Sequence, residues 1–138
     1  AVFAERYVEG SEYTVAILGN QVLPSIRIEV SGGFYDFDAK YKSKSTRFYC
    51  PSGLSIKDES ELAALALAAF KSVGGEIWGR VDLIRDFAGR WHLLEVNTIP
   101  GMTVHSLVPM AAEAAGISMI ELLQKIYEFS VETKRGVR

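Results

Sequence analysis

The sequence is poor in several features that would assign a protein to a broad class. It has a single cysteine, Cys50, so it forms no internal disulfide, and a reducing compartment is expected. No run approaches the roughly 20 apolar residues of a membrane span, and no export signal opens the chain. The net charge of −2 offers no broad basic surface for a phosphate backbone. We therefore expect a cytoplasmic protein that binds neither membrane nor nucleic acid.

The sequence does contain enough apolar residues to build a core. Its 138 residues are near the usual size of one domain, and 49% are hydrophobic while 23% are charged. The chain opens without methionine on AVFAERYV, which already has a strand pattern. We therefore expect a segment of a longer polypeptide, with one domain over residues 1–131 and a frayed polar tail at 132–138.

Strand and helix patterns follow one another along the chain. Residues 2–8 and 12–19 are rich in β-branched and aromatic residues, and turn residues at 9–11 predict that they form an antiparallel pair. Residues 31–53 lack a regular pattern and predict a long, cationic loop. Further strands are expected at 26–30, 77–85 and 91–97, and helices at 57–73, from Ser106, and from Ser118 to about Val131. The expected class is α+β, a mainly antiparallel sheet with helices packed against it.

Polar residues recur at alternate positions in the last two expected strands. Arg80 and Asp82 share one face of their strand, and Glu95 and Asn97 share one face of the other. An even number of residues in the connecting loop would align these four side chains on one face, whereas an odd number would place Asp82 opposite Leu94. We expect the aligned arrangement.

Two carboxylates that face each other across a ladder need a compensating positive charge. Arg80 could pair with one or both of them. Alternatively, a hard divalent cation such as Mg²⁺ could bind, because two carboxylates and an amide supply only oxygen ligands. The hairpin alone leaves both possibilities open.

A backbone break and a helix start follow this pair of strands in RWHLLEVNTIPGMTVHSL. Gly101 can expose its N–H or allow a ligand to approach closely. A helix that starts at Ser106 presents free N–H groups, which suit a carboxylate or phosphate. Ser106 could instead be an ordinary N-cap, worth about 1 kcal/mol. Because this helix start follows the acid–amide face of Asp82, Glu95 and Asn97 and lies near Arg80 in the expected fold, an anion site is the favoured interpretation.

The stretch GRVDLIRDFAGRWHLLEVNTIPGMTVHSLVPMAAEAAGIS closely resembles the C-terminal part of D-alanine–D-alanine ligases of the ATP-grasp superfamily. The resemblance extends through EGSEYTVAILGN, LPSIRI and GGFYDFDAKY, and covers roughly residues 2–130 in the same order. It implies the C-terminal part of an ATP-grasp fold. It also implies ATP-dependent joining of two D-alanines through an acyl phosphate, for peptidoglycan synthesis.

The resemblance also implies roles for the residues after the break and for the acid–amide face. Two Mg²⁺ ions, with Mn²⁺ as a possible substitute, would bind Asp82, Glu95 and Asn97. Arg80 and the N–H of Gly101 would stabilise the oxyanion of the tetrahedral intermediate. The carboxylate of the second D-alanine would bind Ser106 and the N–H of Leu107.

By the same resemblance, the nucleotide would lie against the start of the chain. The adenine would contact Glu5 and the backbone of Arg6 and Val8, and the ribose would contact Glu12. Three further residues would belong to a lid that closes over the nucleotide. Tyr35 would help cover the site, Lys40 would lie near the γ-phosphate, and Tyr41 would be a catalytic residue near the substrate. Phe37 stands where some relatives have tyrosine, which leaves only ring packing at that position.

The expected partners are D-alanine and ATP, with a homodimeric parent enzyme. Two rival interpretations stay open: an ATP-grasp ligase with another acceptor, such as D-lactate, and a non-catalytic module that binds nucleotide or metal. The chain resembles only the C-terminal part of the ligase, so we expect this chain alone to be inactive. His92 is expected to be a surface or packing residue, and His105 a structural residue beside the helix.

Overall fold

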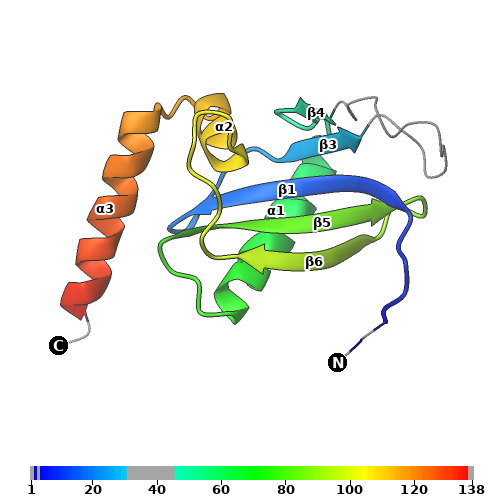
Figure 1. Cartoon of the computed structure of the whole chain (residues 1–138), viewed down its shortest axis with the longest axis horizontal. Helices are drawn as coiled ribbons and strands as arrows, with labels where there is room; N and C mark the ends of the chain where they lie inside the picture. Colours follow the sequence, from blue (N-terminus) through cyan, green and yellow to red (C-terminus); the bar gives the residue numbers. More distant parts are fainter. Residues whose placement is uncertain (1, 3, 31–45, 137–138) are drawn as a thin grey trace.

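A computed structural model describes residue 2 and residues 4–30 and 46–136. Its single sheet has the strand order β4-β3-β1-β5-β6, and a short strand, β2, pairs with the end of β1 (Figure 1). All strand pairs are antiparallel. The strands are β1 (Gly10–Leu18), β2 (Gln21–Val22), β3 (Ile26–Val30), β4 (Thr46–Tyr49), β5 (Trp78–Asp86) and β6 (Trp91–Asn97); the helices are α1 (Ile56–Ser72), α2 (Leu107–Ala114) and α3 (Met119–Gly136). The expected α+β class, with a mainly antiparallel sheet, is confirmed.

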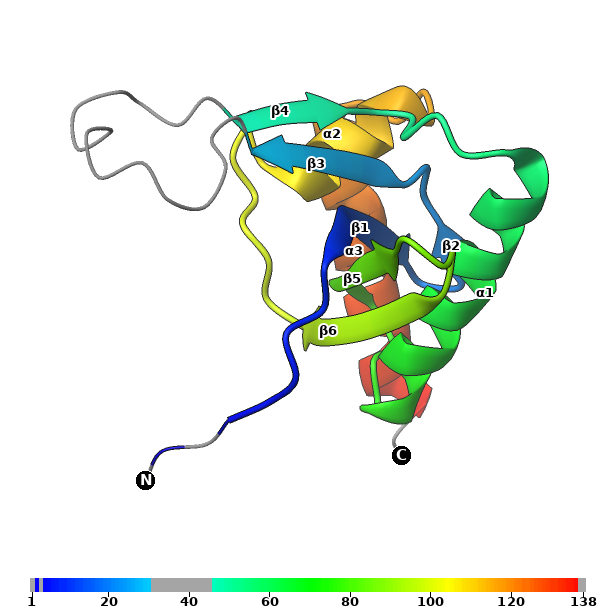
Figure 2. The same cartoon turned by 90° about the vertical axis from the view of Figure 1, so that its right-hand side faces the viewer.

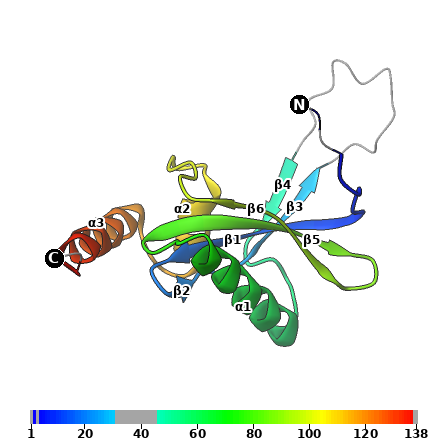
Figure 3. The ribbon, with the colours of Figure 1, turned by 90° about the horizontal axis from the view of Figure 1, so that it is seen from below.

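Helices cover both faces of the sheet, which lies between α1 and α2 (Figure 3). Alternate residues of β1 therefore enter two different cores. Tyr13, Val15 and Ile17 pack with α1, whereas Ala16 and Leu18 pack with α2 and α3. On the α2 face, the helices cover only the end of β1 that holds Ala16 and Leu18, and this leaves the other end available for a site.

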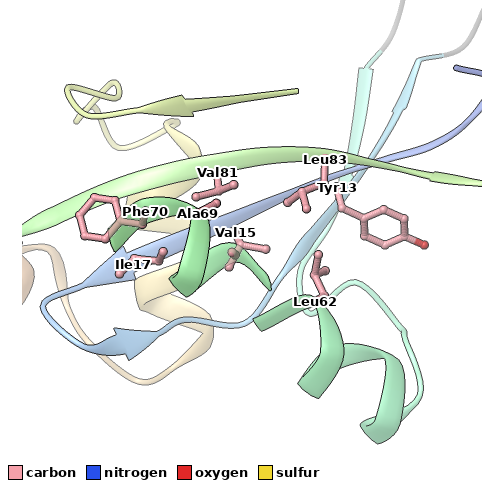
Figure 4. Packing of buried hydrophobic residues seen from close by; sticks show 9 residues of the cluster. Tyr13, Val15, Ile17, Leu62, Ala69, Phe70, Val81 and Leu83 are labelled. Carbon is pink, nitrogen blue, oxygen red and sulfur yellow. The ribbon is translucent and has the colours of Figure 1, made fainter. Parts of the chain in front are cut away.

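The helix α1 forms as its local signals predict, within one residue of the expected bounds. Ser55 is its N-cap and accepts a hydrogen bond from the backbone N–H of Asp58 at 3.1 Å. Gly74, with φ of 77°, follows its C-terminus in the left-handed conformation that glycine tolerates. Leu62, Ala66, Ala69 and Phe70 recur at helical spacing and face the sheet (Figure 4).

The expected strand at residues 2–8 is wrong. The described residues 2 and 4–9 form no strand, and Figure 2 shows this segment running away from the sheet. The reason is that β1 pairs with β3 along one edge and with β5 along the other, so neither edge is open to a further strand. The turn-like residues 9–11 instead lie at and just before the start of β1.

The expected loop at 31–53 is also wrong in part. Residues 46–49 form β4, which pairs with β3 from Arg27 to Val30. Residues 31–45 lie outside the described part of the chain, and with them the lid residues Tyr35, Phe37, Lys40 and Tyr41.

The hairpin of β5 and β6 reaches the expected alignment by an unexpected route. Five residues, 86–90, separate the paired Arg85 and Trp91, so the connection is odd in length. The pairs Asp82–Glu95 and Arg80–Asn97 still form, because a β-bulge at Leu94 shifts the register by one residue. Without that shift, Trp91 and Glu95, an even number of positions apart, would share one face.

Because of the bulge, Trp91 and Glu95 face opposite sides of the sheet although they are an even number of positions apart. Trp91 packs against the α1 core, with its ring 5.1 Å from that of Tyr13 in an edge-to-face contact. Glu95 and Asn97 point to the α2 side, with Arg80 and Asp82.

The two C-terminal helices meet at a sharp angle. Among the described residues no single helix is long and apolar enough to cross a membrane; α2 and residues 119–133 of α3 would qualify only together, and they are bent by 105°. Both helices contribute to the core on the α2 face, through Val108, Ala111, Ala112 and Leu122. The helix α3 continues to Gly136, past the expected end near Val131.

Candidate functional site

The four polar side chains of β5 and β6 lie on one face, as the alternation predicts. Arg80 makes a bidentate contact with Asp82, with Nε 2.9 Å from Oδ1 and Nη2 2.7 Å from Oδ2. The same Nη2 lies 3.9 Å from Oε1 of Glu95. Of the two alternatives for charge compensation, pairing with Arg80 is therefore present in the structure. The hydrogen bond to Asp82 raises the pKa of the Arg80 guanidinium, while burial acts in the opposite direction.

Thr14 is a further partner of Asp82 that sequence reasoning missed. It lies directly opposite Asp82 on β1, is only 1% exposed, and donates a hydrogen bond from its hydroxyl to Oδ1. The Asp82 carboxylate is therefore held from two sides. No local pattern could have identified Thr14, because its role depends on β1 lying beside β5.

A cleft of about 650 Å³ opens on this face and joins two groups of predicted residues. The residues predicted to bind nucleotide, Glu5, Arg6, Val8 and Glu12, line one part of the cleft. The acidic residues Asp82 and Glu95 line another part. Five apolar or aromatic residues and a histidine, none of them predicted for the site, complete much of the wall: Tyr7, Ile28, Ile84, Leu93, Leu94 and His92. Residues far apart in the sequence thus form one hollow with an apolar wall and an acidic end.

A second hollow, of about 470 Å³, lies at the start of α1. It is lined mainly by apolar residues such as Leu23, Pro24, Pro51 and Leu54. It contains none of the predicted site residues, so the candidate site is the cleft on the α2 face.

The segment after β6 brings Gly101 close to Ser106. A Cβ on Gly101 would lie 3.0 Å from Oγ of Ser106, so a side chain there would crowd the serine. The side-chain oxygen of Asn97 accepts a hydrogen bond from the N–H of Ile99 at 3.1 Å and begins the turn. Neither Gly101 nor Ser106 lines the cleft described above.

The N-cap position predicted for Ser106 is confirmed, but the stabilising side-chain hydrogen bond is absent. Oγ of Ser106 instead accepts from the N–H of Thr103 at 3.0 Å and lies 2.9 Å from the Thr103 hydroxyl. The first N–H groups of α2, including that of Leu107, therefore donate no hydrogen bond to the side chain of this serine. Their use in an anion site stays a prediction.

A network of hydrogen bonds closes the tip of the hairpin beside the cleft. The Asp86 carboxylate accepts from the N–H groups of Ala88 and Arg90, from Nε of Arg90, and from Nε2 of His92. The His92 contact, with the backbone contact of Arg90 second, holds the pKa of Asp86 well below its ordinary value. His92, expected to be a surface or packing residue, lines the cleft, and Asp86 orients its ring.

This network predicts how stability depends on pH. The folded chain favours ionised Asp86, so the contribution is complete above the ordinary carboxyl pKa and is lost as the pH falls below it. We expect Asp86→Asn to lower Tm at about pH 7 and to have a clearly smaller effect at about pH 2.5, where the wild type is losing the contribution too. Thermal melts followed by circular dichroism at both pH values measure the difference. Glu113→Gln, at an exposed helix position, is the control. A difference in Tm between the wild type and Asp86→Asn that stays the same at both pH values would contradict the role given to Asp86.

Comparisons with known proteins agree with the fold. The family model for the D-ala D-ala ligase C-terminus matches residues 1–128. A D-alanine–D-alanine ligase of Alkalilimnicola ehrlichii is 59% identical over 125 residues, which are 91% of this chain and 40% of the relative. The chain thus spans about two fifths of the length of that relative.

Solved structures show the same similarity. The D-alanine–D-alanine ligase of Bacillus anthracis complexed with ATP has a TM-score of 0.84 and 34% identity, over 97% of this chain and 44% of that one. The VanG D-Ala:D-Ser ligase of Enterococcus faecalis has a TM-score of 0.75 and 33% identity, over 89% of this chain and 37% of that one. This similarity confirms the expected ligase fold. The chain belongs to the D-alanine–D-alanine ligase family and corresponds to its C-terminal part.

Proposed function

We propose that this chain is part of a cytoplasmic ATP-dependent ligase that joins two D-alanines for peptidoglycan synthesis. The observation that carries the proposal is the cleft, which joins Glu5, Arg6, Val8 and Glu12 to the acidic pair Asp82 and Glu95. An apolar wall suits a flat base, and an acidic end suits a metal-bound polyphosphate. The similarity to a ligase complexed with ATP supports the same assignment.

The acidic face fits Mg²⁺ by the chemistry of its donors. Asp82 and Glu95 are opposite each other in the ladder, and Asn97 lies on the same face, so all the donors are oxygens. Among the described residues no group of three His, Cys, Asp or Glu side chains could hold a metal. Two Mg²⁺ ions, or Mn²⁺, would therefore share Asp82, Glu95 and Asn97 with the nucleotide phosphates. When bound, they would neutralise charge on the transferring phosphoryl group.

The remaining residues have roles in the two chemical steps. The carboxylate of the first D-alanine attacks the γ-phosphate of ATP, and the amine of the second D-alanine then displaces phosphate from the acyl phosphate. Arg80 and the N–H of Gly101 stabilise the oxyanion that forms in the second step. Ser106 and the N–H of Leu107 bind the carboxylate of the second D-alanine. This role agrees with the uncapped start of α2. Tyr35, Lys40 and Tyr41 would close over the nucleotide and belong to the same proposal.

A ligase that uses another acceptor is the second candidate, because VanG, a D-Ala:D-Ser ligase, has the same fold. D-Lactate would be another such acceptor. Product analysis of the intact enzyme with D-alanine, D-serine and D-lactate in competition distinguishes these activities. The first candidate requires D-alanyl-D-alanine as the main product at neutral pH. We also expect the intact enzyme to be a homodimer, which its mass in solution would test.

The isolated chain should bind ATP weakly and only with Mg²⁺, because without the metal the phosphates would face Asp82 and Glu95, two carboxylates for which Arg80 supplies only one positive charge. Calorimetry with ATP, with and without MgCl₂, measures this difference. Equal affinity for ATP with and without MgCl₂ would contradict the proposed metal site at Asp82, Glu95 and Asn97. We also expect no D-alanyl-D-alanine from the 138-residue chain, under conditions in which an intact relative is active. Product formed by the chain alone would show that the rest of the ligase is dispensable.

A further inference from the structure

One guanidinium nitrogen of Arg80 lies between the two carboxylates. Its Nη2 is 2.7 Å from Asp82 and 3.9 Å from Glu95. The side chains of Arg80 and Asp82 are only 20% and 19% exposed, so solvent screens this pair incompletely. Arg80 is therefore the positive charge that both acids share in the structure, and it pairs mainly with Asp82.

We infer that Arg80 and a divalent cation compete for the Asp82 carboxylate, so that metal binding releases the guanidinium toward the reacting groups. The inference rests on the metal site proposed above at Asp82, Glu95 and Asn97. It adds a change of partner by Arg80, which links its availability to occupation of the metal site.

The competition follows from the positive charge that Arg80 places beside both oxygens of Asp82. A carboxylate offers about four lone-pair positions, and Nε and Nη2 of Arg80 and the hydroxyl of Thr14 already occupy three. Because both oxygens of Asp82 bind the guanidinium, a metal that binds either oxygen approaches a positive charge directly. The repulsion between the two positive charges then favours a state in which Arg80 gives up at least one of its two contacts. Thr14 is neutral and can stay, which keeps the carboxylate oriented.

The released guanidinium would be free at the stage when the reaction needs it. While Arg80 is held by Asp82, its charge is neutralised and both of its contacting nitrogens are occupied. Once a metal takes Asp82, Arg80 has donors available for a developing oxyanion. The arginine would thus become available only after the metal has bound.

Mn²⁺ binding to variants of the chain tests the inference without any measurement of activity. Electron paramagnetic resonance of free Mn²⁺ gives the affinity in the absence of nucleotide. We expect Arg80→Gln to bind Mn²⁺ at least about tenfold more tightly than the wild type, because the competing charge is gone. Arg80→Lys keeps a charge but loses the bidentate contact, and should lie between the two.

Arg85→Gln is the matched control. It removes the same charge from the same strand, but Arg85 faces α1, where it pairs with Asp58 at 2.7 Å. Its Mn²⁺ affinity should stay within about twofold of the wild type, since only a distant charge is lost. Circular dichroism shows whether each variant is folded. If Arg80→Gln does not fold, Arg80→Lys still tests the inference.

The outcomes separate this inference from the proposed metal site. Mn²⁺ binding that is lost in Asp82→Asn but unchanged or weaker in both Arg80 variants overturns the competition and leaves the metal site in place. No Mn²⁺ binding in any protein overturns both. In ¹⁵N spectra, we also expect MgCl₂ to shift the Nε–H signal of Arg80, identified by its absence in Arg80→Gln. A signal that stays unchanged at saturating Mg²⁺ would contradict the release.

Discussion

Replacing Glu95 with glutamine is expected to abolish the Mg²⁺-dependence of ATP binding while leaving the chain folded. Glu95 is the better of the two acids for this test because its side chain is 61% exposed and lies 3.9 Å from Arg80. Such a long, exposed ion pair contributes about 0.5 kcal/mol or less to stability. A loss of binding would therefore report on the ligand site and not on folding. Asp82, held by both Arg80 and Thr14, would mix the two effects.

In an intact ligase with this segment, the same substitution should lower turnover about a thousandfold, which corresponds to about 4 kcal/mol of transition-state stabilisation. Calorimetry with ATP and a kinetic assay for phosphate release measure the two effects. Glu61→Gln is a closely matched control, because Glu61 is 54% exposed and lies 3.8 Å from Lys57. If Glu95→Gln retains the Mg²⁺-dependence of the wild type, Glu95 is not a metal ligand.

Replacing Phe70 with alanine should have the largest effect on stability. The Phe70 side chain is 1% exposed and packs between α1 and the sheet (Figure 4). The ring fills space that glycine leaves open, since a Cβ on Gly79 would lie 2.6 Å from it. We expect the free energy of unfolding to fall by about 3–5 kcal/mol, because the surrounding residues cannot close the cavity.

Urea denaturation of Phe70→Ala measures this loss. Phe87→Ala is the control: Phe87 is 85% exposed at the tip of the hairpin, so its free energy of unfolding should change by less than about 0.5 kcal/mol. A loss below about 1 kcal/mol at Phe70 would mean that α1 packs less tightly than the structure shows.

The elements that the sequence predicts well are those with local signals. Ser55 and Gly74 flank α1, and the expected helix at 57–73 differs from it by one residue at each end. The hairpin of β5 and β6 is likewise predicted by alternating polar and apolar residues. In contrast, residues 2–8 have a strand composition, but both sides of β1, their expected partner, are already paired. Residues 46–49 become a strand only because β3 is beside them. Pairing over long distances is not visible in local composition.

The site divides in the same way. The shared face of Arg80, Asp82, Glu95 and Asn97 follows from alternation, although the bulge that produces it does not. What compensates the two carboxylates depends on which side chains meet in three dimensions, and both Arg80 and a divalent cation were consistent with the sequence. The cleft joins the segment before β1 to the middle of β5 and to β6, so its apolar wall depends on the order of strands in the sheet.

The bulge at Leu94 also affects how this chain meets other molecules. In the described part of the chain β6 is an outer strand of the sheet, and Leu93 and Leu94 on it are 46% and 52% exposed. A regular outer strand with two exposed leucines would be a template for edge-to-edge association between copies. The extra residue interrupts the repeat of backbone donors and acceptors along that edge. The irregularity that aligns the acids therefore also makes β6 a poorer template for edge-to-edge association.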